Sequence, residues 1–363
     1  MSAPFYSQAV SDAFRRWAGG EPAQVWTAPG RVNLIGEHTD YNGGFVLPIA
    51  IDRYTSVAAR RRADGRLRCH SLEVADDCDW PKYLDGVLRA LAADGVEVGG
   101  ADVLVTSTVP AGAGLSSSAA LEVAAVAALS TLGGVHLDRR QLALVAYRAE
   151  TEFVGVPVGI MDQTVVALAE QDHALFLDAR SLETEQVRFA PVASGLHVVV
   201  VDSGIRRRLD DGRYAERRRE CEEAAAALGV AQLRDATPGQ VEDADLDDPL
   251  RRRARHVVTE DERVLQAVGV LKGGDVAGLG PLLLASHASL RDDFEVSIPE
   301  LDRVVEQATD AGALGARMTG GGFGGSALAL VPHGALDAVF GRFGDAAFEV
   351  RPVGGVRRTA PMR

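Results

Sequence analysis

Residues 30–41 join a short strand to a turn that is crowded with hydrogen-bonding side chains. An apolar run in the first half of this segment is typical of a buried strand, and a glycine ends it. The turn that follows, residues 36–41, is called the signature turn and carries Glu37, His38 and Asp40. Carboxylates accept hydrogen bonds and imidazole can donate or accept them, so this set can fix the orientation of a ligand rich in hydroxyl groups.

A second motif, residues 109–118, predicts a site for an anion, and we call it the serine loop. Its sequence VPAGAGLSSS ends a strand and leads into an alanine-rich helix that begins near Ser117. Free N–H groups and the positive dipole end at the start of a helix attract negative charge. Gly112 and Gly114 let the backbone curve around a phosphate, and the three serines add donors and one candidate Mg²⁺ ligand. A simple helix cap is the alternative role for the serines.

The sequence supports neither of two common nucleotide-binding folds. The pattern G-x-x-x-x-G-K-[ST] does not occur and the serine loop contains no lysine, which excludes a Walker-type NTPase. No G-x-G-x-x-G follows a strand with an acidic residue about twenty positions later, so a dinucleotide-binding fold gains no support. Residues 320–325, which we call the glycine turn, are predicted either as a tight hairpin or as a phosphate contact, and the two are compatible.

Carboxylates that follow the serine loop are candidates for phosphoryl-transfer chemistry, which needs Mg²⁺, a positioned nucleophile and positive charge. Glu150 is expected near the C-terminal end of a helix, where it opposes the dipole and needs a partner such as a metal ion. Asp162 is flanked by apolar residues, so its charge would be partly buried, and Arg31 could pair with it. A turn or cap role is the alternative for Asp162. The full set of carboxylates is Glu122, Glu150, Glu152 and Asp162.

Composition and charge exclude other classes of protein. The chain has 363 residues and a formal net charge of −13, so we expect no nucleic-acid or anionic-membrane surface. No apolar stretch approaches the roughly 18 residues of a transmembrane helix, and the N-terminus has no signal-peptide pattern. Cys69, Cys78 and Cys221 are odd in number and match no metal spacing, which favours reduced thiols. We therefore expect a soluble cytoplasmic protein.

The order of expected elements predicts an α+β chain in two lobes with a ligand cleft between them. The boundary falls between Pro191 and Gly195, which gives an N-terminal lobe of residues 1–192 and a C-terminal lobe of residues 193–363. Strands are expected at 24–28, 31–35, 45–51, 54–61, 66–70, 101–109, 164–169, 173–178, 186–190, 197–201, 313–318, 326–331 and 346–352, and helices at 7–18, 83–94, 117–131, 139–153, 214–228, 251–270, 274–289 and 298–311.

These motifs resemble those of galactokinases, within the superfamily that also includes homoserine, mevalonate and phosphomevalonate kinases. The segment GRVNLIGEHTDYNGG is similar to the galactokinase signature, VPAGAGLSSSAALE to the superfamily's phosphate loop, and GARMTGGGFGGS to its third glycine-rich motif. ETEFVGVPVGIMDQ, YAERRRECEEA and SHASLRDDFEVSIPELD also match galactokinase patterns. The resemblance therefore covers nearly the whole chain.

The resemblance implies a two-lobed small-molecule kinase with mixed and antiparallel sheets, packed helices and an interlobe cleft, unlike Walker-type or protein kinases. It implies direct in-line transfer from ATP to C1 of galactose, the first committed step of galactose catabolism, with Mg²⁺. Trp80 could instead be an ordinary core residue. The segment 206–212 departs from the family, because it is more charged than is typical there. By this resemblance Arg31 and Asp162 are catalytic, Glu37, His38, Asp40, Gly159 and Tyr214 bind the sugar, Trp80, Gly112, Gly114, Leu115, Ser116, Ser117 and Ser118 bind ATP, and Ser118 and Glu150 coordinate Mg²⁺.

Two alternatives from different functional classes stay open at this point. The chain could phosphorylate a related sugar such as N-acetylgalactosamine or arabinose, although the residues after the signature turn favour galactose. It could also be a galactose and ATP sensor without turnover, but such regulators have lost residues that follow Leu115, and here Ser116–Ala120 is intact. Whether Asp162 acts as a general base or as a positioner is open as well. A monomer is favoured over an oligomer.

Overall fold

The first of three sheets contains the longest strands of the chain. The computed structural model describes residues 3–73, 79–206 and 212–359. The strands of the first sheet lie in the order β12-β1-β3-β5-β4, and every neighbouring pair is antiparallel except β4 and β5. Their bounds are β1 Gln24–Asn33, β3 Pro48–Arg62, β4 Leu67–Ser71, β5 Gly100–Ser107 and β12 Arg357–Arg358.

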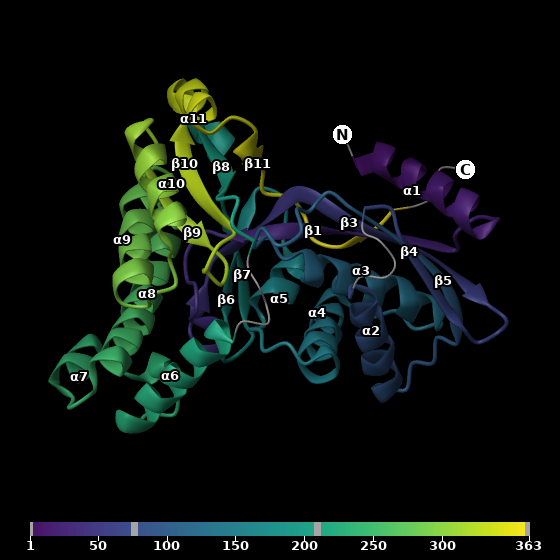
Figure 1. Ribbon diagram of the computed structural model, residues 1–363, viewed down its shortest axis with the longest axis horizontal. Coiled ribbons are helices and arrows are strands. Elements are labelled where there is room, and N and C mark those ends of the chain that lie inside the picture. Colours follow the sequence, from purple (N-terminus) through teal and green to yellow (C-terminus); the bar gives the residue numbers. More distant parts are fainter. Residues whose placement is uncertain (1–2, 74–78, 207–211, 360–363) are drawn as a thin grey trace.

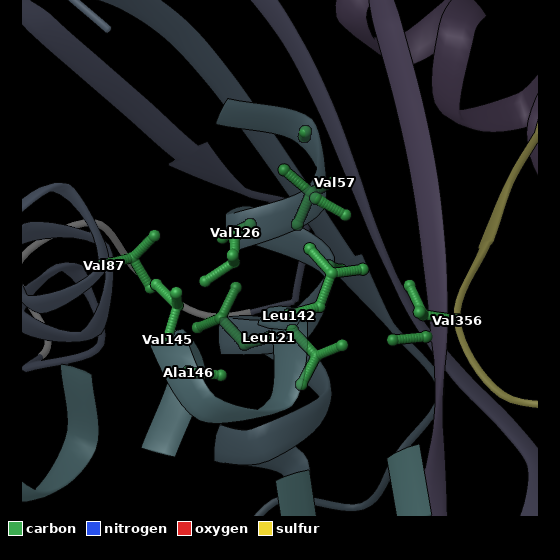
Figure 2. Packing of buried hydrophobic residues seen from close by; sticks show 14 of the residues in the cluster. Val57, Val87, Leu121, Val126, Leu142, Val145, Ala146 and Val356 are labelled. Carbon is green, nitrogen blue, oxygen red and sulfur yellow. The ribbon is translucent and has the colours of Figure 1, made fainter. Parts of the chain in front are cut away.

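Helices cover both faces of this sheet (Figure 1). Helix α1 packs Phe14 against Ala58 and Leu104 on one face. On the other face Val57, the neighbour of Ala58 in β3, packs among residues of α2 to α5 (Figure 2). Because neighbouring residues of a strand point to opposite faces, a sheet covered on both sides needs continuous apolar runs. The helices are α1 Ala3–Ala18, α2 Pro81–Ala93, α3 Ser117–Leu132, α4 Arg139–Arg148 and α5 Met161–Leu168.

The second half of the chain supplies a four-stranded antiparallel sheet in the order β11-β8-β10-β9. Helices α8, α9 and α10 stand together beside β9 (Figure 1). A smaller sheet, β2-β6-β7, contacts both β3 and α8. The elements are β2 Phe45–Val46, β6 His173–Asp178, β7 Thr184–Arg188, β8 Leu196–Asp202, β9 Gly315–Thr319, β10 Ser326–Pro332, β11 Ala347–Val350, α6 Arg213–Ala227, α7 Pro238–Asp243, α8 Asp248–Lys272, α9 Leu279–Asp292, α10 Pro299–Asp310 and α11 Leu336–Phe343.

The two halves of the chain share a packed apolar core. Ile35 and Leu47 from the first half belong to one buried cluster with Val264 of α8 and Leu328 of β10. The chain also returns to its starting sheet at the end, where β12 pairs with β1. The expected α+β architecture with mixed and antiparallel sheets is confirmed, whereas the lobe boundary at 192/193 stays a prediction.

The strand expected at 164–169 is wrong, because this segment belongs to helix α5. Residues 165–169, VVALA, are all apolar, and a short buried run of this kind fits a strand or a buried helix equally well. This difference matters for the site, because Asp162 lies in the first turn of α5 and not before a strand. The helix expected at 139–153 ends as α-helix at Arg148 and continues as a π-helical turn, Ala149–Val154.

The sequence analysis made expectations about membrane-spanning helices and about cysteines. None of the helices in residues 3–73, 79–206 and 212–359 is both long and apolar enough to cross a membrane. Cys221 is a buried free thiol. Cys78 lies outside the described residues, as do residues 207–211 of the charged segment before Tyr214.

Candidate active site

Every residue that the family resemblance assigns to the site lines one cavity of about 440 Å³, whereas the other two candidate carboxylates, Glu122 and Glu152, do not line it. A volume of this size is typical of a small-molecule site. The signature turn and the start of α6 line one end of the cavity, and the serine loop, the glycine turn and α5 also line it. The two halves of the chain therefore meet at a single pocket.

Arg31 and Asp162 form the ion pair that the sequence suggested. Arg31 is 5 % exposed, and its Nε and Nη2 donate to Oδ1 and Oδ2 of Asp162, both at 2.7 Å. Its Nη1 donates to the carbonyl of Gly114 at 2.5 Å, and the hydroxyl of Ser116 donates to Asp162 Oδ2. A bidentate ion pair of this kind fixes the orientation of both side chains and compensates the charge of each. Asp162 is therefore held by side chains and does not cap its helix, whose N-cap is Ile160.

The serine loop has the conformation that its glycines predicted, with φ of 70° at Gly112 and 77° at Gly114. Ser116 precedes α3 in a left-handed conformation, and its side chain makes no capping hydrogen bond. The simple-cap alternative is therefore wrong for Ser116. Its neighbours Ser117 and Ser118 line the cavity at the N-terminus of α3, as does Leu115.

The glycine turn is both a hairpin and a neighbour of the serine loop. Strands β9 and β10 pair directly on either side of it. The hydroxyl of Ser326 donates to the carbonyl of Ala113 at 2.9 Å, which joins the two loops. Gly320 and Gly321 line the cavity, so the two roles proposed for this segment are compatible in the fold.

The signature-turn end of the cavity combines a buried carboxylate with aromatic rings. Oδ1 of Asp40 accepts from the N–H of Tyr41 at 2.9 Å, and Oδ2 accepts from the N–H of Met161 at 3.5 Å. Burial, followed by the nearby charge of Asp162, raises the pKa of Asp40 to about 6. His38 bonds the hydroxyl of Tyr41 through Nδ1 at 2.8 Å, and its ring lies 5.4 Å from that of Tyr214.

Gly159 lies directly against Asp40. A Cβ atom at position 159 would fall 1.6 Å from Oδ2 of Asp40, closer than any non-bonded contact allows. A side chain at this position would therefore displace the carboxylate. Gly159 also lines the cavity.

Glu37 lines the same end of the cavity, yet its carboxylate is already well supplied with donors. Oε2 accepts from Nδ2 of Asn33 at 2.8 Å and pairs with Nη1 of Arg317 at 2.5 Å. Oε1 accepts from the N–H of Gly320 at 2.9 Å and from the hydroxyl of Thr319 at 3.2 Å. Glu37 therefore ties the signature turn to the glycine turn.

Glu150 is a buried carboxylate whose surroundings suit a bound cation. It is 3 % exposed, and Nε2 of Gln163 donates to it at 2.6 Å. Burial raises the pKa of Glu150 to about 7, and burial and Glu150 raise that of the neighbouring Glu122 well above its ordinary value. Within the described part of the chain no ion pair compensates Glu150, and no three His, Cys, Asp or Glu side chains are grouped to hold a metal. Mg²⁺ needs only one or two protein oxygens beside phosphate oxygens, so Ser118 and Glu150 fit it as a donor set.

One end of the cavity, at the start of α2, is lined by aromatic side chains. Trp80 is the N-cap residue of α2, and its side chain packs against the core and also lines the cavity. A core role and an ATP-binding role are therefore compatible for this residue. Tyr83 and Glu73 line this end as well, and the sequence analysis missed both. Oε2 of Glu73 accepts from the N–H of Ser107 at 3.0 Å. No motif marks these residues. Tyr83 lies in α2, which packs on α3 and on the π-helical turn, and Glu73 contacts Thr106 and Ser107 at the end of β5.

Family models match three parts of the chain. Residues 12–61 match the galactokinase galactose-binding signature, residues 82–170 the N-terminal domain of GHMP kinases, and residues 266–349 the C-terminal domain of GHMP kinases. Together these matches include the signature turn, the serine loop, Asp162 and the glycine turn.

Several known proteins are similar to this chain over nearly its full length. A galactokinase from Streptomyces coelicolor is 50% identical over 96% of this chain and 97% of its own, and one from Roseiflexus is 44% identical over 90% and 88%. The crystal structure of Lactococcus lactis galactokinase complexed with galactose superposes with a TM-score of 0.90 at 32% identity, covering 97% of this chain and 99% of that one. A mevalonate kinase structure shares the fold at 18% identity, with a TM-score of 0.68 and coverage of 91% and 99%.

Proposed function

This chain belongs to the galactokinase family, and on that premise we propose how it phosphorylates galactose with ATP. The observation that carries the proposal is the Arg31–Asp162 pair, which lies in the same cavity as the signature turn and the serine loop. A sugar bound at one end and a triphosphate bound at the other would meet at this pair. The C1 hydroxyl of galactose is the acceptor.

In the proposed mechanism, the oxygen of the C1 hydroxyl attacks the γ-phosphorus while the bond to the β,γ-bridging oxygen breaks and ADP leaves. Asp162 accepts the hydroxyl proton or orients the hydroxyl for attack, and Arg31 stabilises the negative charge that develops. A loose transition state makes alignment more important than the strength of the base. The bidentate contact to Arg31 supports this role because it holds the carboxylate in one orientation.

The rest of the cavity supplies binding and charge compensation. Glu37, His38, Asp40, Gly159 and Tyr214 would bind the sugar hydroxyls, and Trp80 would pack on the adenine. The N–H groups and hydroxyls of the serine loop would bind the phosphates. Ser118 and Glu150 would hold Mg²⁺, which neutralises charge on phosphate oxygens when bound.

Gly159→Ala is expected to weaken galactose binding by about 10²-fold, because the new methyl group must displace Asp40. Titration calorimetry with galactose measures the change. Gly269→Ala is the matched control, since an added Cβ there meets nothing within 4 Å. Equal galactose affinity in the two variants would remove Gly159 and Asp40 from the sugar site.

Galactose affinity is expected to fall about 10-fold as pH drops from 7 to 5. Asp40 accepts hydrogen bonds from sugar hydroxyls best when it is an ionised carboxylate. Burial together with Asp162 raises its pKa to about 6 in the free protein. Protonation through this range therefore competes with the sugar, and one pKa unit corresponds to about tenfold in the ionised fraction at the acid end. Calorimetry at both pH values tests this, with Asp40→Asn as a control whose affinity should be flat. Tighter binding at pH 5 would contradict the assignment.

An assay of ADP release tests the function as a whole and separates it from the two alternatives. With galactose, N-acetylgalactosamine, arabinose and no sugar in parallel, we expect rapid release with galactose alone. Preference for another of these sugars would identify a related kinase, and galactose binding without release would identify a sensor. We also propose a cytoplasmic monomer, which sedimentation of the purified chain and fractionation of cells test separately.

A further inference from the structure

Arg317 is a fully buried arginine that the mechanism does not use. It lies in β9, three residues before Gly320, where the glycine turn begins, and its side chain is 0% exposed. A buried guanidinium destabilises a fold unless it is paired and hydrogen-bonded. Its partners therefore indicate what the chain gains from keeping it.

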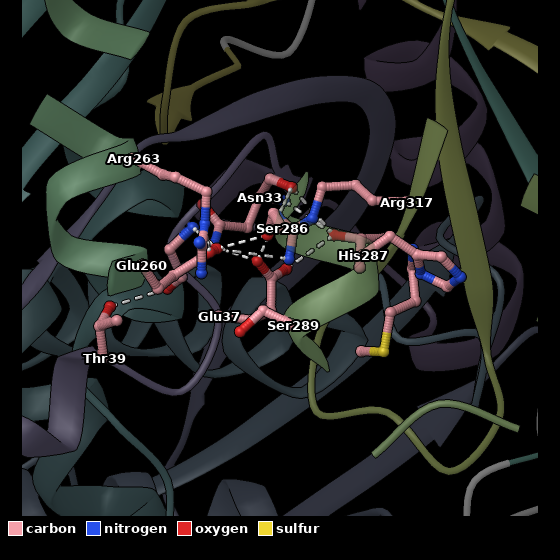
Figure 3. Close-up of polar contacts among 12 residues, drawn as sticks. Asn33, Glu37, Thr39, Glu260, Arg263, Ser286, His287, Ser289 and Arg317 are labelled. Atoms are coloured by element: carbon pink, nitrogen blue, oxygen red, sulfur yellow. Dashed lines mark hydrogen bonds and ion pairs between the residues drawn. The ribbon is translucent and has the colours of Figure 1, made fainter. Parts of the chain in front are cut away.

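The contacts of Arg317 converge on the signature turn. Its Nη1 pairs with Oε2 of Glu37 at 2.5 Å and donates to the carbonyl of Leu34 at 3.0 Å. Its Nη2 lies 3.9 Å from Oε1 of Glu260 in α8. Figure 3 shows this cluster, in which one arginine from the second half of the chain reaches the end of β1 and the start of the turn.

Glu260 holds the other side of the same turn. Its Oε1 accepts from the N–H of Gly36 at 2.9 Å and from the hydroxyl of Ser286 at 2.6 Å, and Nε of Arg263 donates to Oε2 at 2.7 Å. Burial raises its pKa, but Arg263 and Arg317 outweigh burial and lower it to about 2. Glu260 is therefore charged, and the buried carboxylates of Glu37 and Glu260 are matched by two guanidinium groups.

We propose that Arg317 is a positioning residue for galactose binding, which acts by holding Glu37 and the start of the signature turn in place. The proposal rests on the sugar pocket of the proposed function. Without the guanidinium, Glu37 would be a buried carboxylate with no cation beside it and would take up a proton or turn away. The sugar end of the cavity would lose its shape, whereas the end lined by Trp80 would keep it.

Arg317→Met tests the proposal, because methionine fills much of the space without the charge. We expect the KM for galactose to rise about 30-fold while the KM for ATP changes by less than about 2-fold, since the loss lies in ground-state sugar binding. Arg317→Lys restores a positive charge but lacks the planar fork, so an intermediate rise of about 5-fold is expected. If the methionine variant does not fold, the lysine variant carries the same test.

Arg253→Met is the matched control for loss of a buried guanidinium. Arg253 is 2 % exposed and pairs with Glu220 and Glu295, each at 2.7 Å, and it does not line the cavity. Its loss should lower the melting temperature and leave the KM for galactose unchanged. A combined Glu37→Gln/Arg317→Met variant should lose less than the product of the two single losses, because both changes act on one pair.

The possible results separate this inference from the proposed function. A wild-type chain that does not bind galactose would overturn the proposed function and the inference with it. Wild-type binding, combined with a galactose KM for the folded Arg317 variants within about 2-fold of wild type, would overturn the inference alone. Equal rises in KM for galactose and for ATP would also overturn it, because they would indicate a general loss of structure.

Discussion

Asp162→Ala is expected to lower kcat by about 10³- to 10⁴-fold while galactose still binds. The reason is that the carboxylate lies where the C1 hydroxyl and the γ-phosphoryl group would meet, and Arg31 and Ser116 hold it in one orientation. Sugar binding should survive because we assign it mainly to the signature turn. The coupled ADP-release rate and galactose calorimetry on the same sample measure the two effects separately.

Controls distinguish chemistry from stability in this experiment. Removal of Asp162 leaves Arg31 buried without its carboxylate, so the melting temperature of the variant must be measured as well. Asp261→Asn is the matched control: this carboxylate is also buried, its pKa is raised to about 7 by burial, and it does not line the cavity. It should keep a normal kcat. A near-normal kcat for Asp162→Ala would refute the assigned role.

Asp162→Asn then addresses whether the residue acts as a base or as a positioner. Asparagine can accept a hydrogen bond from the C1 hydroxyl but cannot take its proton. If alignment is the main contribution, the asparagine variant should be clearly faster than the alanine variant. Equal rates for the two would indicate that proton acceptance or charge is what matters.

The parts of the site that are local in sequence could be predicted from the sequence. The signature turn and the serine loop each contain their own glycines and polar side chains, so their residues predict a ligand rich in hydroxyl groups for the first and an anion for the second. The Arg31–Asp162 pair could also be anticipated, because a carboxylate in an apolar segment needs a cation. Its geometry could not, since the segment around Asp162 was expected to precede a strand and is a helix.

The support behind the site could not be predicted, because it joins residues far apart in the chain. Glu37 and Arg317 are 280 positions apart and meet only after β9 packs beside β1. The one signal in the sequence is an arginine inside the buried strand GARMT, which implies a buried partner without saying which. Tyr83 and Glu73 were missed for the same reason, since the packing of α2 on α3 and the contact of Glu73 with the end of β5 bring them to the cavity.

Glucose, the C4 epimer of galactose, is expected to be phosphorylated with a kcat/KM about 10⁴-fold lower than that of galactose. A pocket that hydrogen-bonds a hydroxyl in one position leaves its own buried groups unpaired when that hydroxyl points elsewhere. We assign this role to Asp40, because it is buried and its position is fixed by the N–H groups of Tyr41 and Met161 and by the close approach of Gly159. Steady-state rates with both sugars measure the ratio. In Asp40→Asn the ratio should shrink, mainly through a loss of activity on galactose. Comparable kcat/KM values for the two sugars in the wild-type enzyme would mean that the signature turn does not read the C4 hydroxyl.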